Sequence, residues 1–146
     1  MTRSLTDAEW KALVLDHYKK PRHFGVLEGA TFQAEQHNRT CGDWVKVYAS
    51  PVGPDQSQLN FQFTGQGCSL SMASASLMCE LLKGSDQKAA TRVLEHFQKV
   101  RAEGATADEA EAWQVLSGLR QYPVRYRCVC LAWQALEQIL KGETHE

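Results

Sequence analysis

Residues 59–83 read LNFQFTGQGCSLSMASASLMCELLK, and the change of pattern within this stretch decides the fold class. Apolar and polar residues alternate from Leu59 to Thr64, which is typical of a β-strand with one buried face. After the glycine-flanked Cys68, small and apolar residues from Ser69 to Lys83 predict a helix. The sequence therefore predicts that a strand ends and a helix begins at a cysteine.

Two further strands are predicted upstream, over residues 31–36 and 44–50. A seven-residue segment, 37–43, joins them, and the turn-rich segment 51–55 leads into the third strand. Successive strands on such short connections predict a small antiparallel three-stranded sheet.

The rest of the chain has a helical pattern. The capping box Thr6-Asp7-Ala8-Glu9 predicts a helix over residues 7–19. A second capping box, Thr106 to Glu109, opens one of the later helices, and residues 123–127 are expected to be extended before the last one. The predicted helices after the sheet are 69–83, 86–102, 108–119 and 129–141. Strands followed by helices predict an α+β fold in which helices cover one face of the sheet.

Size and charge exclude several classes of protein. The 146 residues, with a mass of 16.4 kDa, predict one domain over 1–146. Sixteen basic and seventeen acidic side chains give a net charge of −1, so nucleic acid is not expected as a partner. Acidic residues precede any apolar run at the N-terminus, and no uncharged stretch is apolar enough to span a membrane. A cytoplasmic protein is therefore expected.

Five cysteines, an odd number, direct attention to thiol chemistry or metal binding rather than disulfides. A thiol at a helix N-terminus is stabilised as thiolate, and both Cys68 and Cys128 are predicted to begin helices. Arg125 and Arg127 add positive charge beside Cys128. In the turn Cys41-Gly42-Asp43, glycine allows the thiol and the carboxylate to point the same way.

Three thiolates and one carboxylate, from Cys41, Asp43, Cys68 and Cys128, would make a tetrahedral zinc site or hold a small iron–sulfur cluster. Cys79 is assigned to the core because it lies about three helical turns beyond Cys68. Packing is also favoured for Cys130, with chelation as the alternative.

The five histidines are less informative. His17, His96 and His145 are interpreted as structural or solvated, and His23 and His37 are placed in loops that could approach a metal. A purely structural zinc module and a Cys–His hydrolase are further alternatives.

Several ordered motifs resemble the U-type iron–sulfur cluster assembly proteins, the NifU-like N-terminal domain family. They are Asp16-His17-Tyr18-Lys19-Lys20-Pro21-Arg22-His23-Phe24-Gly25, Cys41-Gly42-Asp43, the segment from Gly65 to Ser76, and Arg127-Cys128. The resemblance implies the family's α+β fold, a role in cluster assembly, and a PLP-dependent cysteine desulfurase as the partner that delivers sulfur.

Two features resemble the SufU-type branch of that family. Arg127 stands where the housekeeping scaffolds usually have a histidine, which leaves Asp43 as the fourth ligand, and helical segments between Gly84 and Gly118 resemble the branch's insertion. The leading hypothesis is that the four ligands bind zinc and that Cys41 accepts persulfide sulfur. The alternative is a scaffold on which a transient [2Fe–2S] cluster is built and passed to apo-proteins.

Overall fold

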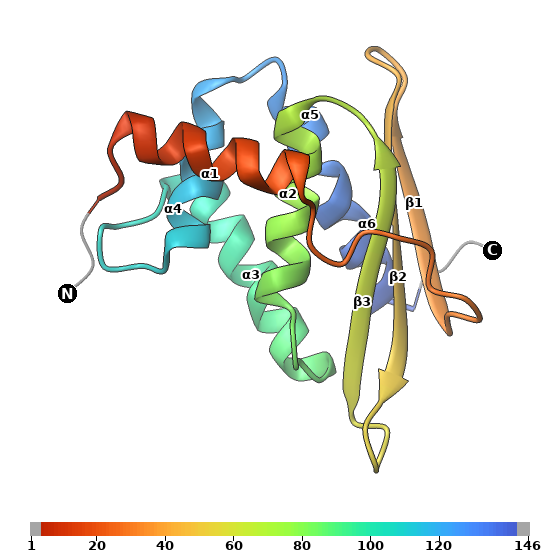
Figure 1. Ribbon diagram of the computed structural model, residues 1–146. Coiled ribbons are helices and arrows are strands. Elements are labelled where there is room, and N and C mark those ends of the chain that lie inside the picture. The colour runs from red at the N-terminus through yellow and green to blue at the C-terminus, as the bar shows by residue number, and fades with distance from the viewer. Residues whose placement is uncertain (1–3, 143–146) are drawn as a thin grey trace.

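The computed structural model describes residues 4–142, and its chain runs from one helix through three strands into a series of helices (Figure 1). The elements are α1 (Asp7–Lys19), β1 (Phe32–Asn38), β2 (Asp43–Val52), β3 (Gln58–Gln66), α2 (Ser69–Leu81), α3 (Gln87–Glu103), α4 (Glu111–Gly118), the 3₁₀ turn η1 (Leu119–Gln121), α5 (Tyr126–Val129) and α6 (Leu131–Leu140). The prediction of an α+β fold is confirmed. The prediction for His145 lies outside the described residues.

The sheet is antiparallel throughout, with the strands in the order β1-β2-β3. All three strands are longer than predicted. The β1–β2 turn needs only residues 39–42, so His37 pairs with Trp44 and Asn38 with Asp43. Gly42 has a φ of +81°, a conformation that glycine adopts without steric cost, and its N–H donates to the carbonyl of Asn38. The placement of His37 in a loop was therefore wrong.

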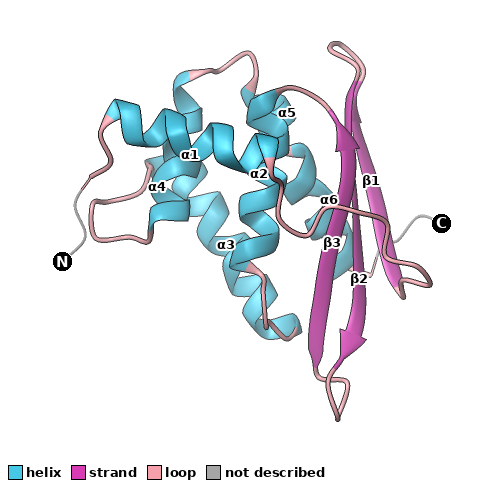
Figure 2. Ribbon diagram, in the orientation of Figure 1, coloured by secondary structure: helices cyan, strands magenta, loops and turns pink. Residues whose placement is uncertain are grey.

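The helices gather on one side of the sheet, as Figure 2 shows. Helix α2 packs against β3, and α6 packs against β1 and β2. Val45, Val47 and Phe63 are fully buried between these layers. Helix α2 is buried on every side from Leu70 to Cys79, because α1, α5 and α6 also contact it. A helix buried all round needs small or apolar residues at every position, which explains its composition.

Helix α1 begins as predicted. The side chain of Thr6 accepts from the N–H of Glu9, and the Glu9 carboxylate accepts from the N–H of Thr6.

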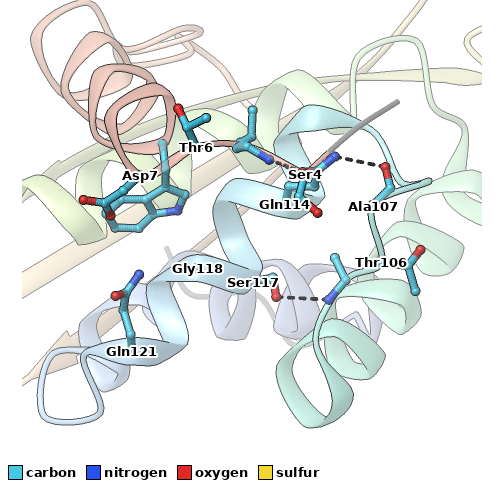
Figure 3. Close-up of a pocket in the computed structure, with 12 residues that line it drawn as sticks. Ser4, Thr6, Asp7, Thr106, Ala107, Gln114, Ser117, Gly118 and Gln121 are labelled. Atoms are coloured by element: carbon cyan, nitrogen blue, oxygen red, sulfur yellow. Dashed lines mark hydrogen bonds between the residues drawn. The ribbon is translucent and has the colours of Figure 1, made fainter. Parts of the chain in front are cut away.

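The Trp10 indole donates to the carbonyl of Val115 at 3.0 Å, and a Cβ at Gly118 would overlap that indole. Figure 3 shows the adjoining pocket of about 390 Å³. The carboxamide of Gln114 in its wall accepts from the N–H of Leu5.

Two helix boundaries differ from the prediction. The second capping contact forms, since the Thr106 N–H donates to the Glu109 carboxylate. Glu109 also pairs with His96. The helix begins only at Glu111. Residues 123–127 are not extended. Proline's fixed φ suits the first turn of a helix, and the chain turns at Pro123 directly into α5.

No helix within residues 4–142 combines the length and apolar character that crossing a bilayer would require.

Candidate metal centre

The β1–β2 turn, the start of α2 and helix α5 come together beyond one end of the sheet (Figure 1). They enclose a pocket of about 660 Å³, here called the thiol pocket. Its walls include all four residues that the sequence singled out as metal ligands: Cys41, Asp43, Cys68 and Cys128. Side chains separated by up to 87 positions in the chain therefore face one cavity.

Three of these four residues form a tight group. Ligand atoms of Cys41, Asp43 and Cys128 all lie within 4.8 Å of one another. The sulfur atoms of Cys41 and Cys128 are 2.9 Å apart. Cys41 is exposed on the turn, whereas Cys128 is only 4% exposed. The group thus pairs an accessible thiol with a shielded one.

Cys68 lines the same pocket but is not a member of that tight group. It stands immediately before the first residue of α2, as predicted, with its sulfur 3.8 Å from the hydroxyl oxygen of Ser71. Its backbone N–H donates to the Asp43 carboxylate at 3.2 Å. The first N–H groups of a helix have no partner within the helix, and the Asp43 carboxylate accepts a bond from the N–H just before α2. Negative charge is stabilised at this end of a helix.

Ser71 and Gly67 lie next to the Asp43 carboxylate. The Ser71 hydroxyl lies 3.3 Å from Asp43 Oδ2, although its shorter bond, 3.0 Å, is to the carbonyl of Cys68. A Cβ built on Gly67 would stand 2.7 Å from the same carboxylate oxygen. Only glycine leaves room for so close an approach. Gly67 therefore allows Asp43 to reach the start of α2.

Asn38 connects the turn to α5. Its side-chain N–H₂ donates to the sulfur of Cys128 at 3.3 Å, and its side-chain oxygen accepts from the N–H of Thr40 at 3.0 Å. The carbonyl of Asn38 lies 3.9 Å from the sulfur of Cys41. Hydrogen bonds from neighbouring groups orient and stabilise metal-binding side chains in many proteins.

The surroundings of Cys128 differ from the expectation. The residue lies inside the short helix α5, not at a helix N-terminus, because the helical turn already begins at Tyr126. Burial, followed by the neighbouring Cys41 thiol and Asp43, raises the pKa of Cys128 to about 12, while the hydrogen bond from Asn38 opposes this. In the metal-free protein, Cys128 is accordingly a protonated thiol at neutral pH.

The other two cysteines are buried away from the tight group. Cys79 is 1% exposed within α2, and burial raises the pKa of its thiol, so its assignment to the core is confirmed. Cys130 is 2% exposed at the junction of α5 and α6. It is not part of the metal-binding group found among residues 4–142, so packing remains the better interpretation.

The histidines of the described chain also lie outside that group. His23 approaches Glu80 at 3.7 Å, and His37 pairs with Glu35 and stacks on Trp44. His17 is buried and bonds to Ser76, and His96 pairs with Glu109. The contacts of His17 and His96 agree with the prediction that these histidines are structural or solvated.

Asn38, Gly67 and Ser71 were not recognised as functional candidates from the sequence. Asn38 and Ser71 each lie three residues from a candidate cysteine, and Gly67 directly precedes one. That proximity was the available signal. However, asparagine is common in turns and serine in helices of small residues, so the signal alone did not separate a functional role from a structural one.

The donor set fits a divalent metal that prefers soft ligands. Zinc in proteins is bound by thiolates, imidazoles and carboxylates, commonly four in a tetrahedral arrangement. Cys41, Cys128 and Asp43 supply two sulfurs and an oxygen within one small volume, and Cys68 adds a third sulfur in the same pocket. Mg²⁺ and Ca²⁺ prefer oxygen ligands, so this set does not suit them.

Comparisons with known proteins identify the family and the relatives of this chain. The sequence model of the protein family described as the NifU-like N-terminal domain matches residues 9–101 of this chain. The zinc-dependent sulfurtransferase SufU of Bacillus subtilis (strain 168) is 33% identical over 134 residues, covering 90% of this chain and 89% of that protein. The iron–sulfur cluster assembly scaffold protein IscU of Streptococcus pyogenes serotype M1 is 32% identical over 135 residues, covering 90% and 82%.

A solved structure is similar over nearly the same length. It is that of a protein from Fervidobacterium islandicum AW-1 assigned to the SUF system as an iron–sulfur cluster assembly scaffold. Its TM-score is 0.75 at 27% sequence identity, and the match covers 88% of this chain and 93% of that one.

Proposed function

Because this chain belongs to the NifU-like N-terminal domain family of iron–sulfur cluster assembly proteins, we propose that it binds zinc in the thiol pocket and accepts sulfur from a cysteine desulfurase. The observation that carries this proposal is the approach of the exposed Cys41 to the buried Cys128, 2.9 Å away, with Asp43 beside both. The name of the Bacillus subtilis relative, a zinc-dependent sulfurtransferase, supports it.

The zinc ligands are Cys41, Asp43, Cys68 and Cys128. When bound, zinc supplies positive charge that keeps the thiols deprotonated. The protein's own groups do the rest of the positioning. The N–H of Cys68 holds the Asp43 carboxylate, and the amide of Asn38 holds the sulfur of Cys128.

Cys41 is the sulfur acceptor, since it is the exposed thiol of the tight group. Its thiolate attacks the outer sulfur of a persulfide carried by the desulfurase. A new S–S bond forms at Cys41, the S–S bond on the desulfurase breaks, and the desulfurase cysteine leaves as a thiolate. The exchange conserves electrons and needs no external oxidant.

Cys128 is suited to a different task. It is shielded from solvent and accepts a hydrogen bond from Asn38, so it stays a ligand while Cys41 reacts.

A PLP-dependent cysteine desulfurase is the partner in this scheme, apo iron–sulfur proteins are the final recipients, and the cytoplasm is the location.

The alternative is a scaffold that holds a transient [2Fe–2S] cluster with the same thiols. The Streptococcus pyogenes relative is named as an iron–sulfur cluster assembly scaffold protein. Thiolate sites generally bind zinc more tightly than ferrous iron, so zinc found in the purified protein does not by itself separate the two functions.

The test combines the zinc-loaded protein with a PLP-dependent cysteine desulfurase and cysteine, and measures sulfide release and the persulfide on each thiol by mass spectrometry. We expect the desulfurase to release sulfide faster than it does without this protein, and we expect a persulfide on Cys41. C41S should abolish both, whereas C79A, which alters a buried cysteine outside the pocket, should retain both.

Sulfur transfer that survives C41S with one zinc still bound would refute the role of Cys41. Cluster absorbance after anaerobic reconstitution, followed by transfer to an apo-protein, would establish the scaffold function instead.

A further inference from the structure

A second pocket, of about 510 Å³, adjoins the thiol pocket and shares Asn38, Pro123 and Arg127 with it. We call it the basic pocket, because Arg39, Arg101 and Arg127 all line it. The three arginines come from the β1–β2 turn, the last turn of α3 and helix α5. The fold therefore brings three positive charges from distant parts of the chain to one hollow.

Within residues 4–142, no carboxylate pairs with these three arginines. No aspartate or glutamate lines the basic pocket, and within residues 4–142 none of the three arginines has a carboxylate within 4.0 Å. Arg22, by contrast, pairs with Asp16. The net charge of the whole chain is −1, so the cluster does not follow from a generally basic composition. Arg39, Arg101 and Arg127 are exposed, so their guanidinium groups are available to an anion that enters the pocket.

The wall of the basic pocket also contains one buried polar group without a hydrogen-bond partner among residues 4–142. Tyr126 lines it, and the Tyr126 hydroxyl is buried with no hydrogen-bond partner in the described part of the chain. Buried polar groups are nearly always hydrogen-bonded, so a donor left unpaired beside a basic hollow is a sign of a missing acceptor.

We propose that the basic pocket binds a small oxyanion, a phosphate or polycarboxylate group, held by Arg39, Arg101 and Arg127. The guanidinium group presents a planar fork of donors that matches the oxygens of carboxylate and phosphate. The volume lies within the range of small-molecule sites, roughly 300–1,000 Å³. The site is separate from the proposed zinc ligands, and its occupancy does not depend on sulfur transfer.

The location suggests what the anion does. Arg127 directly precedes Cys128, and Asn38 both lines the basic pocket and bonds to the sulfur of Cys128. An anion held by these residues fixes the turn and α5 relative to each other. A small anionic metabolite bound in the basic pocket would therefore lie next to the thiol pocket and its reactive residue, Cys41.

The test is a ¹H–¹⁵N NMR titration of the purified protein with inorganic phosphate and, separately, citrate, both at constant ionic strength against sodium chloride. We expect saturable shifts of the amide signals of Arg39, Tyr126 and Gln134. R101Q should raise the dissociation constant about tenfold, the usual effect of losing one charged hydrogen bond. R92Q removes the same charge from an exposed position of α3 outside this pocket and should leave the constant within about twofold.

Shifts equal to those caused by sodium chloride, or equal weakening by R101Q and R92Q, would overturn the proposal. An acidic peptide that saturates the same signals when phosphate and citrate do not would also overturn it, because the site would then recognise a protein partner. The zinc content and sulfur-transfer activity of R101Q are measured separately, so a failure here is distinct from a failure of the proposed function.

Discussion

The side-chain amide of Asn38 donates to the sulfur of Cys128 at 3.3 Å, joining two residues that lie 90 positions apart. The contact links the turn that carries Cys41 and Asp43 to the helix that carries Cys128. A sulfur that accepts such a bond is better stabilised as a thiolate. Asn38 thus supports one thiol of the candidate centre and leaves Cys41 as the more exposed one.

The first prediction concerns this bond. N38D keeps a side-chain oxygen for the N–H of Thr40 but removes the donor to Cys128 and adds a negative charge. We expect zinc affinity to fall by about 10- to 100-fold, as is typical when a group supporting a metal ligand is lost. Competition with a chromophoric chelator measures the affinity. N60D, which makes the same change in β3, should bind zinc normally, and equal affinities for the two variants would contradict the role of Asn38.

The second prediction concerns the space at Gly67. In G67A the added methyl would stand 2.5 Å from the Ser71 hydroxyl and 2.7 Å from the Asp43 carboxylate, so these side chains must shift. We expect at least about a tenfold loss of zinc affinity and a loss of about 1–3 kcal/mol in the free energy of unfolding.

A matched control separates the two effects of that substitution. G53A places a methyl in open space at a φ of +92°, so it strains the backbone far from the thiol pocket. It should lower the free energy of unfolding and leave zinc affinity intact. If G53A lost zinc as readily as G67A, the close approach of Asp43 would not be the cause.

The third prediction follows from the 2.9 Å separation of the Cys41 and Cys128 sulfurs. After metal removal, treatment with diamide should join these two cysteines in a disulfide, because both thiols already lie within reach of each other. Peptide mapping by mass spectrometry identifies the pair. Zinc-loaded protein without the desulfurase should resist the oxidation, since both thiolates would then be held as metal ligands. Cross-linking of Cys41 to Cys68 in preference to Cys128 would contradict the geometry.

The fourth prediction concerns pH and the buried His17. Burial, and then the charge of Arg22, lowers its pKa from the usual 6.5, while Asp16 and Glu80 oppose the shift. Nδ1 of His17 lies 2.7 Å from the hydroxyl oxygen of Ser76, which also accepts from the N–H of Arg22. The folded state therefore favours the uncharged ring.

The sign of the pH effect follows from this preference. Below pH 6.5 the unfolded chain binds a proton at His17 more readily than the folded one, so the free energy of unfolding falls as the pH drops from 6.5 towards the lowered pKa. One group contributes at most about 1.4 kcal/mol per pH unit. Urea unfolding at pH 7.5 and 5.5 should show a smaller decrease for H17Q than for the original chain. Identical decreases would rule out His17 as the cause.

Much of the fold was predictable because its signals are local. The capping box at Thr6, the alternation in β3 and the small-residue run after Cys68 each depend on neighbours a few positions away, and the structure confirms all three. One error arose where a distant contact overrode a local signal. Glu109 pairs with His96 of α3, and the helix predicted to begin at Asp108 begins three residues later, at Glu111.

By itself, the sequence determined the α+β class, the junction at Cys68 and the identity of the candidate ligands, because hydrophobic periodicity and capping act over a few residues. Only the tertiary structure decided that Cys41, Asp43 and Cys128 form the tight group, that Cys68 stands slightly apart, and that three arginines share a pocket. Those relationships depend on the register of the β1–β2 turn and on how α2 and α5 pack together. Such contacts join residues far apart in the chain, and no local pattern specifies them.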